Sequence, residues 1–209
     1  MPDSKRHKGG KRPQKGTGHF SDKDRSTHQS ARGEKVETLA DLSRQQPTTG
    51  DFTEMVASFT TESDRGCALI AGSFLENTLK MALEGYVVDY DETFLDKLFV
   101  GSDAPMGTFS AMIKMGRALG FYDKGIQAQL ETLKAIRNAF AHAQKPINFS
   151  QPTVVSHCEK LIVAKHSDPN HVFTPRERYT AFCVAFGRKL IDLAVYNAKR
   201  DKKVIFFSL

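Results

Sequence analysis

Apolar side chains recur along this chain at the three- and four-residue spacing of an α-helix. They form a wide face between Cys67 and Leu83, follow helical spacing from residue 124 to 141, and return after Thr174. Such periodicity is typical of amphipathic helices that each bury one face. No convincing alternation at a spacing of two occurs before residues 204–207, a short patch expected to pack on the bundle or on a neighbouring subunit. The pattern predicts an all-α fold, a single bundle of six to seven helices.

Capping and turn residues indicate where these helices begin and end. Short polar side chains accept hydrogen bonds from the first free amides of a helix, proline fits its first turn, and glycine often follows its last. Helices are expected over 34–44, 52–59, 91–99, 109–119 and 124–141, with others after Thr61, Ser150 and Thr174. The expected N-caps are Asp51, Thr61, Thr108, Ser150 and Thr174, and Gly120 is the expected stop of the helix over 109–119.

The apolar faces also predict a core and the state of the cysteines. Three cysteines without paired ligand spacing predict buried thiols in a reducing cytoplasm, with no metal site and no cofactor. Ile162 is expected on the helix after Ser150. The cysteines are Cys67, Cys158 and Cys183, and the methionines and phenylalanines expected in the core are Met81, Met112, Met115, Phe109, Phe182 and Phe186.

Charge is concentrated at the N-terminus. Ten of the 30 Lys and Arg residues and four of the 24 Asp and Glu residues lie within 1–35, so residues 36–209 carry 20 of each sign. Too few apolar residues occur in 1–33 to offset the entropy of ordering, which predicts a disordered basic arm. We expect residues 1–49 to form this arm, with one short helix, and residues 50–209 to form the folded domain. The arm either solubilises the protein or contacts nucleic acid without sequence preference, through Lys5, Arg6, Lys8, Lys11, Arg12 and Lys15.

The charge and hydropathy of the rest of the chain argue against three classes: DNA-reading, membrane-spanning and secreted proteins. The neutral body does not predict a DNA-reading surface, and no helix-turn-helix with a basic recognition helix is visible. No run of eighteen apolar residues is present, and no apolar segment follows the basic N-terminus, so neither a membrane span nor a secretory signal is expected. The sequence predicts a cytoplasmic protein.

Arg137, Asn138 and His142 form the most distinctive polar cluster, at the end of the helix predicted over 124–141. Asn138 and His142 lie one helical turn apart, whereas Arg137 is rotated by about 140° from His142. These residue types suit metal-free RNA cleavage. Histidine can move the proton of a ribose hydroxyl, arginine can hold phosphoryl oxygens, and asparagine can orient either group.

A structural role or a ligand-binding notch is the alternative for the same cluster, and it is the one we favour. In this alternative Arg137 pairs with Asp64 or Glu62, Asn138 binds a loop backbone, and His142 caps its helix. Another set of charges, Glu62, Asp64 and Arg65, has no catalytic spacing of its own. Glu62 and Arg65 can pair at i,i+3, or one of the acids can orient His142 across the bundle.

Two family resemblances bear on this cluster. The string Arg137-Asn138-x-x-x-His142 is similar to a signature of the HEPN superfamily, helical bundles that often dimerise and include metal-independent ribonucleases. A longer set of segments, covering roughly residues 50–165, resembles the mannitol operon repressor (MltR/MtlR) family. The chain departs from that family in its long basic N-terminus. The segments are Glu62–Ile70, Leu98–Pro105, Phe109–Ile113, Leu119-Gly120 and Ile136–His142.

These resemblances imply two different functions. The mannitol operon repressor resemblance implies a transcriptional regulator or co-repressor that acts mainly through protein contacts, with a protein partner or a second copy of the chain. The HEPN resemblance implies a ribonuclease with Arg137 and His142 as catalytic pair and Asn138 as accessory residue. Glu62, Asp64 and Arg65 are the candidate residues to support the cluster, the alternative being the surface pair of Glu62 with Arg65.

Overall fold

The computed structural model describes residues 49–87, 91–101, 103–164 and 168–200, with side chains from Phe52 onward. The chain divides between Gln46 and Pro47 into two units, and every described residue belongs to the second unit. The predicted basic arm, the helix predicted over 34–44 and the apolar patch at 204–207 lie outside the described residues.

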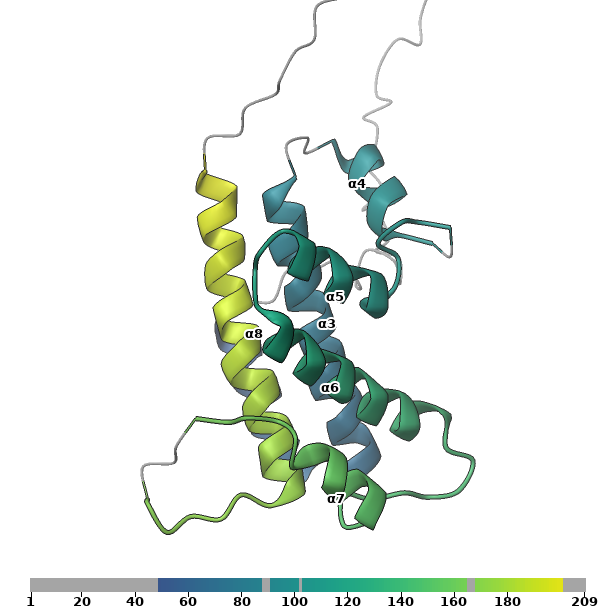
Figure 1. Ribbon diagram of the computed structural model, residues 1–209, viewed down its shortest axis with the longest axis vertical. Coiled ribbons are helices and arrows are strands. Elements are labelled where there is room, and N and C mark those ends of the chain that lie inside the picture. Colours follow the sequence, from purple (N-terminus) through teal and green to yellow (C-terminus); the bar gives the residue numbers. More distant parts are fainter. Residues whose placement is uncertain (1–48, 88–90, 102, 165–167, 201–209) are drawn as a thin grey trace, which may run out of the picture. The chain divides into compact units, whose positions relative to one another are not determined.

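The described residues form seven α-helices and no strand, which confirms the predicted all-α class (Figure 1). None of these helices is long and apolar enough to span a bilayer. The helices are α2 (Thr49–Thr61), α3 (Asp64–Tyr86), α4 (Glu92–Phe99), α5 (Phe109–Ala118), α6 (Lys124–His142), α7 (Pro152–Cys158) and α8 (Pro175–Lys199).

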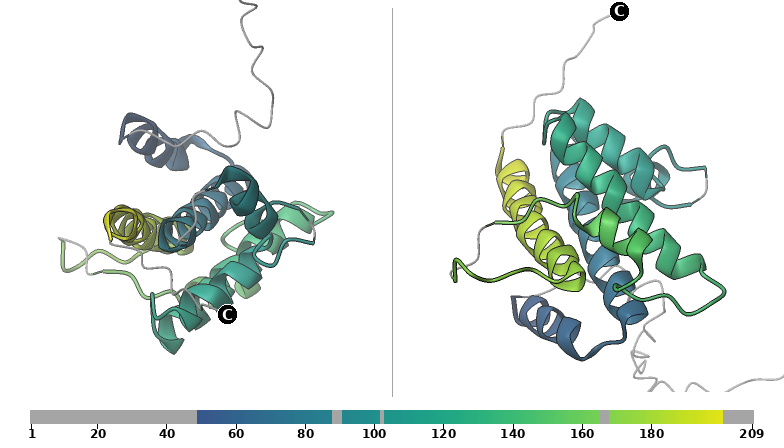
Figure 2. Two further views of the ribbon diagram at one scale, coloured as in Figure 1. Left: turned by 90° about the horizontal axis from the view of Figure 1, so that it is seen from above. Right: turned by 60° about the horizontal axis from the view of Figure 1, so that its bottom comes forward.

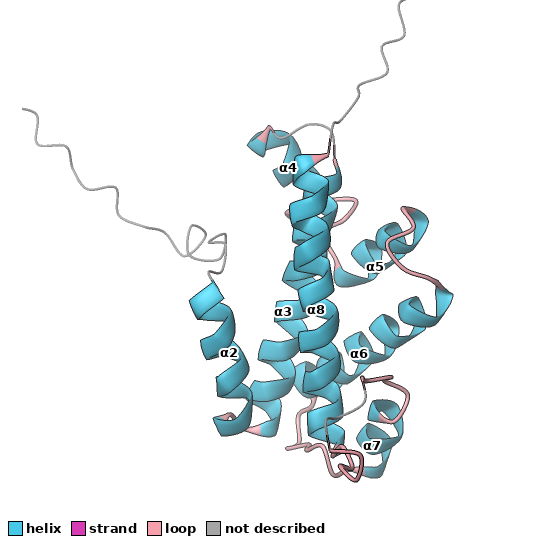
Figure 3. Cartoon of the chain, turned by 90° about the vertical axis from the view of Figure 1, so that its left-hand side faces the viewer, coloured by secondary structure: helices cyan, strands magenta, loops and turns pink. Residues whose placement is uncertain are grey.

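Helices α3 and α8 form the centre of the bundle and run in the same direction. Tyr179 donates a hydrogen bond to the Ala68 carbonyl near their N-terminal ends (2.9 Å). Asn197 donates to the Ala82 carbonyl near their C-terminal ends (3.2 Å). Helix α2 lies on one side of this pair, and α5, α6 and α7 lie on the other (Figures 2 and 3). The bundle therefore has three layers, and the surfaces of α3 and α6 that face each other define the region around Arg137.

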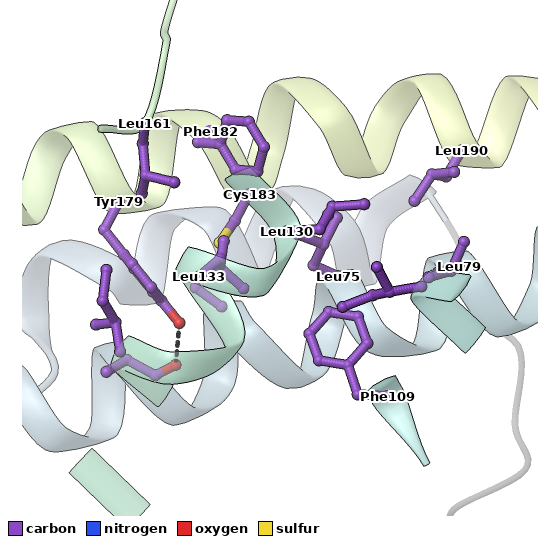
Figure 4. Packing of buried hydrophobic residues seen from close by; sticks show 14 of the residues in the cluster. Leu75, Leu79, Phe109, Leu130, Leu133, Leu161, Tyr179, Phe182, Cys183 and Leu190 are labelled. Carbon is purple, nitrogen blue, oxygen red and sulfur yellow. Dashed lines mark hydrogen bonds between the residues drawn. The ribbon is translucent and has the colours of Figure 1, made fainter. Parts of the chain in front are cut away.

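The core is built from the apolar faces that the sequence predicts. Leu75, Leu79, Leu130 and Leu133 are fully buried. Figure 4 shows Leu133 near Tyr179 and Cys183, and Leu79 further along the bundle near Leu190. All three cysteines are buried and free, as expected. Met115, expected in the core, and Ile162, expected on the helix after Ser150, are both exposed. Met115 is 37% exposed, since it is rotated off the face that buries Met112 and Gly116, and Ile162 is 75% exposed because α7 has already ended at Cys158.

Two of the five predicted N-caps are correct and three are wrong. Asp51 lies inside α2, which already begins at Thr49. Thr108 and Thr174 cap α5 and α8, and Gly120 adopts a positive φ of 75° directly after α5. Thr61 is still part of α2, so Ser63 caps α3 instead, by accepting a hydrogen bond from the Gly66 amide (3.0 Å). Helix α7 starts after Gln151 without a side-chain cap, because Ser150 belongs to the preceding turn, where its amide bonds the Asn148 side chain.

Thr174→Ala is expected to lower the free energy of unfolding by about 1 kcal/mol, the usual contribution of an N-cap. The Thr174 hydroxyl and amide both bond the Glu177 carboxylate (2.8 Å each), and the Glu177 amide bonds the Thr174 hydroxyl (3.2 Å). Urea denaturation followed by far-UV circular dichroism measures the loss, with Thr174→Ser as the control that keeps the hydroxyl. Equal stability of the two variants would contradict a role for the cap.

Candidate functional site

Arg137 lies on α6 and is directed toward α3. Its Nη2 atom is 2.7 Å from Glu76 Oε2, and its Nη1 atom donates to Asn138 Oδ1 (3.2 Å). The stem of the side chain crosses Gly72, where a Cβ atom would lie only 2.7 Å from Arg137 Cγ and 2.9 Å from the Tyr179 hydroxyl. The sequence therefore places a glycine where the arginine must approach the α3 backbone closely.

Glu76 is the acidic partner of Arg137, and its environment is only partly polar. Burial raises the pKa of its carboxyl group, whereas the Arg137 charge and a hydrogen bond from the Phe109 amide lower it; burial is the larger effect. Since Phe109 opens α5, one carboxylate links α3, α5 and α6. We call Glu76, Arg137 and Asn138 the α3–α6 clamp.

His142 is not part of the clamp. It is the last residue of α6 and its side chain is exposed. Two residues of helix correspond to a rotation of about 200°, so His142 faces away from the direction in which Phe140 is buried. Among the described residues, no hydrogen bond or ion pair joins His142 to Arg137, Asp64 or Glu62. The structure brings Arg137 and Asn138 together. His142, about 140° around the helix from Arg137, bonds neither of them.

Asp64 has a different partner from the one expected. Its Oδ1 atom is 2.7 Å from Arg176 Nη1, and its Oδ2 atom accepts a hydrogen bond from the Phe149 amide (2.9 Å). Arg176 Nη2 also donates to the carbonyls of Phe59 (2.5 Å) and Glu62 (2.6 Å). Arg176 thus joins the start of α8 to the turn between α2 and α3, and Asp64 neither orients His142 nor pairs with Arg137.

Arg65 does not form the expected pair with Glu62. Its Nη2 atom donates to the carbonyl of Ala143 (2.5 Å), the C-cap residue of α6. The Glu62 carboxylate instead lies against Gly66, 2.5 Å from the place where a Cβ would stand. Arg65 therefore supplies the capping interaction that the sequence assigned to His142. It is not the partner of Glu62, because Glu62 precedes the helix and does not share a helical face with Arg65.

Two residues of these networks, Glu76 and Arg176, were not among the candidates from the sequence. A signal for each is present. Glu76 directly follows the buried Phe74–Leu75 stretch of α3, where a carboxylate drawn toward the apolar face needs a partner. Arg176 is a cation in the first turn of a helix, where the helix dipole disfavours positive charge unless an acid is close.

Metal binding finds no support within the described ranges, where no three of His, Cys, Asp and Glu gather closely enough to hold an ion. Lys5, Arg6, Lys8, Lys11, Arg12 and Lys15 precede the described residues, so their contact with nucleic acid stays a prediction.

Comparison with known proteins gives one distant structural likeness. No family model matches the chain, and no curated protein matches it. A chain from the X-ray structure of the MtlR–HPr complex of Escherichia coli has 16% sequence identity and a TM-score of 0.46, over 70% of this chain and 98% of that one. This likeness is too distant to assign the chain to a family or to a function.

Proposed function

We propose that this protein is a regulator that acts through protein contacts, in the manner of the mannitol operon repressors that its sequence resembles. One observation carries the proposal. The Arg137 side chain of the shared Arg-Asn-x-x-x-His string is engaged by Glu76 and Asn138 between helices, while His142 is exposed at the end of α6 and bonds neither Arg137 nor Glu76. The string then serves to fix α6 on α3, and the protein works through its surface.

The clamp is poorly suited to acid–base chemistry. A general acid or base must come within hydrogen-bond reach of the group it serves, and the arginine must have donors free for a phosphoryl group. Arg137 already donates to two side chains, and the carboxylate beside it would repel a phosphate. A substrate would have to displace Glu76 from a contact of 2.7 Å before the guanidinium could bind it.

The charge of the body supports a protein partner over a nucleic acid. Residues 36–209 carry 20 basic and 20 acidic side chains, so the folded part has no excess of positive charge. Large apolar side chains are exposed on it, among them Val195 (50%) and Tyr196 (66%) on α8, and tyrosine is enriched at protein interfaces. Operon control by this route needs a partner that itself reads DNA.

A HEPN-type ribonuclease that uses Arg137, Asn138 and His142 is the competing proposal. It requires a second copy of the chain to bring an imidazole to the guanidinium of the first, or a rearrangement at the end of α6. The two proposals differ in a simple assay.

Purified full-length protein is expected to leave single-stranded RNA intact in the presence of a chelator. His142→Ala is expected to change the melting temperature by no more than about 1–2 °C, because His142 is exposed and makes no bond to the described residues. Gel analysis of RNAs of mixed sequence, with a pancreatic-type ribonuclease as positive control, gives the result. If the wild type cleaved RNA and His142→Ala did not, the regulator proposal would be rejected in favour of the ribonuclease.

A further inference from the structure

A second arginine, Arg65, reaches the end of α6 at which His142 stands. The Arg65 guanidinium bonds the carbonyl of Ala143, the residue that directly follows His142. Since consecutive Cα atoms are about 3.8 Å apart, this bond fixes the guanidinium close to the backbone of His142. Arg137 does not bring a cation to His142. Arg65, in the first turn of α3, instead brings its guanidinium to the end of α6 that carries His142.

Both side chains are available to a ligand. Arg65 and His142 are exposed, and so is Lys145, three residues further along the loop after α6. The bond to Ala143 uses one Nη2 hydrogen of Arg65 and leaves its other donors without a partner among the described residues. His142 and Lys145 form no bond to any of the described residues either.

The acids nearby neutralise this cluster only in part. Asp64, the residue before Arg65, is held by Arg176 and by the Phe149 amide. The Glu62 carboxylate lies against Gly66, and no ion pair joins it to Arg65. The end of α6 therefore presents Arg65, His142 and Lys145, which we call the α6-end cluster, with Glu62 as the acid at its border.

We propose that the α6-end cluster binds a single phosphate-type oxyanion, through the guanidinium of Arg65 and the imidazole of His142. A guanidinium offers paired donors in the geometry of a tetrahedral oxyanion, and imidazole supplies a further donor. The neutral charge of residues 36–209 favours one localised anionic group over a polymer, which would need a continuous basic surface. This inference goes beyond the proposed regulator and does not depend on it, because a phosphate site serves a regulator and an enzyme alike.

Titration of the full-length protein with inorganic phosphate tests the site, followed by the imidazole proton resonances of His142 at constant ionic strength. We expect saturable shifts that chloride does not produce. Arg65→Gln is expected to weaken the apparent affinity about tenfold, the effect of losing a hydrogen bond to a charged group. Arg188→Gln removes an exposed guanidinium from the middle of α8 and is expected to leave the affinity unchanged.

The variants separate the site from a general charge effect. His142→Gln keeps a hydrogen-bond donor at this exposed position and should leave the fold intact. Phosphate binding to this variant, followed by the Arg65 Nε resonance, should be weaker than binding to the wild type. Equal titration curves for wild type, Arg65→Gln and Arg188→Gln, or shifts that never saturate, would overturn the site. A single-stranded oligonucleotide that shifts His142 at lower phosphate concentration than inorganic phosphate does would also overturn it, in favour of a polymer surface. If the protein cleaved RNA and still bound phosphate, the proposed regulatory function would be wrong and the proposed phosphate site would be retained.

Discussion

Arg137→Ala is expected to lower the free energy of unfolding by about 2–3 kcal/mol. Removing one member of a buried ion pair leaves an uncompensated charge, which costs about 3–5 kcal/mol when burial is complete. Arg137 and Glu76 keep 27% and 20% of their side-chain surface, so solvent reduces the cost. Urea denaturation near neutral pH measures it. A loss below about 0.5 kcal/mol, the range of ordinary surface substitutions, would show that the clamp does not hold the bundle.

The pH dependence of this loss identifies Glu76 as its cause. Burial raises the pKa of Glu76, and removing Arg137 takes away the charge that lowers it. A carboxyl group whose folded pKa is raised supports the fold at pH values below its unfolded pKa, and this support is lost as pH rises through the folded pKa. The deficit of Arg137→Ala should therefore be small in acid and grow toward neutral pH. In Glu76→Gln, which holds no carboxylate, the deficit of a second Arg137→Ala change should not vary over this range.

Arg176→Ala is expected to cost about 3 kcal/mol, the largest single effect among these substitutions. The change removes the partner of the Asp64 carboxylate and one donor from the carbonyls of both Phe59 and Glu62. Stranded polar groups of this kind cost about 1–3 kcal/mol each, and the pair keeps 26% and 28% of its side-chain surface, which moderates the sum. Loosening of α2 from the start of α8 should accompany the loss, visible as faster amide exchange around Phe59.

Two variants bracket this result. Arg188→Ala removes an exposed arginine from the same helix and should change stability by less than about 0.5 kcal/mol. Asp64→Asn keeps the shape and a hydrogen-bond acceptor for the Phe149 amide but removes the charge, so its loss should be intermediate. If Arg176→Ala were as mild as Arg188→Ala, the bonds of Arg176 would contribute no net stability.

Local features of the fold were predictable from the sequence. The spacing of Leu75, Leu79 and Leu83 is enough to predict a buried face, because helix geometry is set within a few residues. Thr174 followed by proline and Glu177 predicts a capped start, which the structure confirms. The error at Thr61 has the same local origin, since two capping residues stand within three positions and only the length of α2 decides between them.

The partners within the site were not predictable from the sequence. The sequence predicts an acidic partner for Arg137 and offers Asp64 or Glu62, whereas the partner is Glu76, twelve residues further along than Asp64. Twelve residues of helix span about 18 Å, so the choice depends on how far α6 slides along α3, which packing of the two helical surfaces determines. The rotation between Arg137 and His142 was fixed by helix geometry alone, and the structure leaves them apart accordingly.

The parallel pairing of α3 and α8 has a consequence for how this domain forms. The bonded partners Ala68 and Tyr179, Asp64 and Arg176, and Ala82 and Asn197 are separated by 111, 112 and 115 residues. Contacts between such distant segments require closure of a long loop and slow the folding of a chain, even an all-helical one. During synthesis α3 leaves the ribosome well before α8. Until α8 has been translated, the apolar face of α3 remains exposed and can bind chaperones or aggregate.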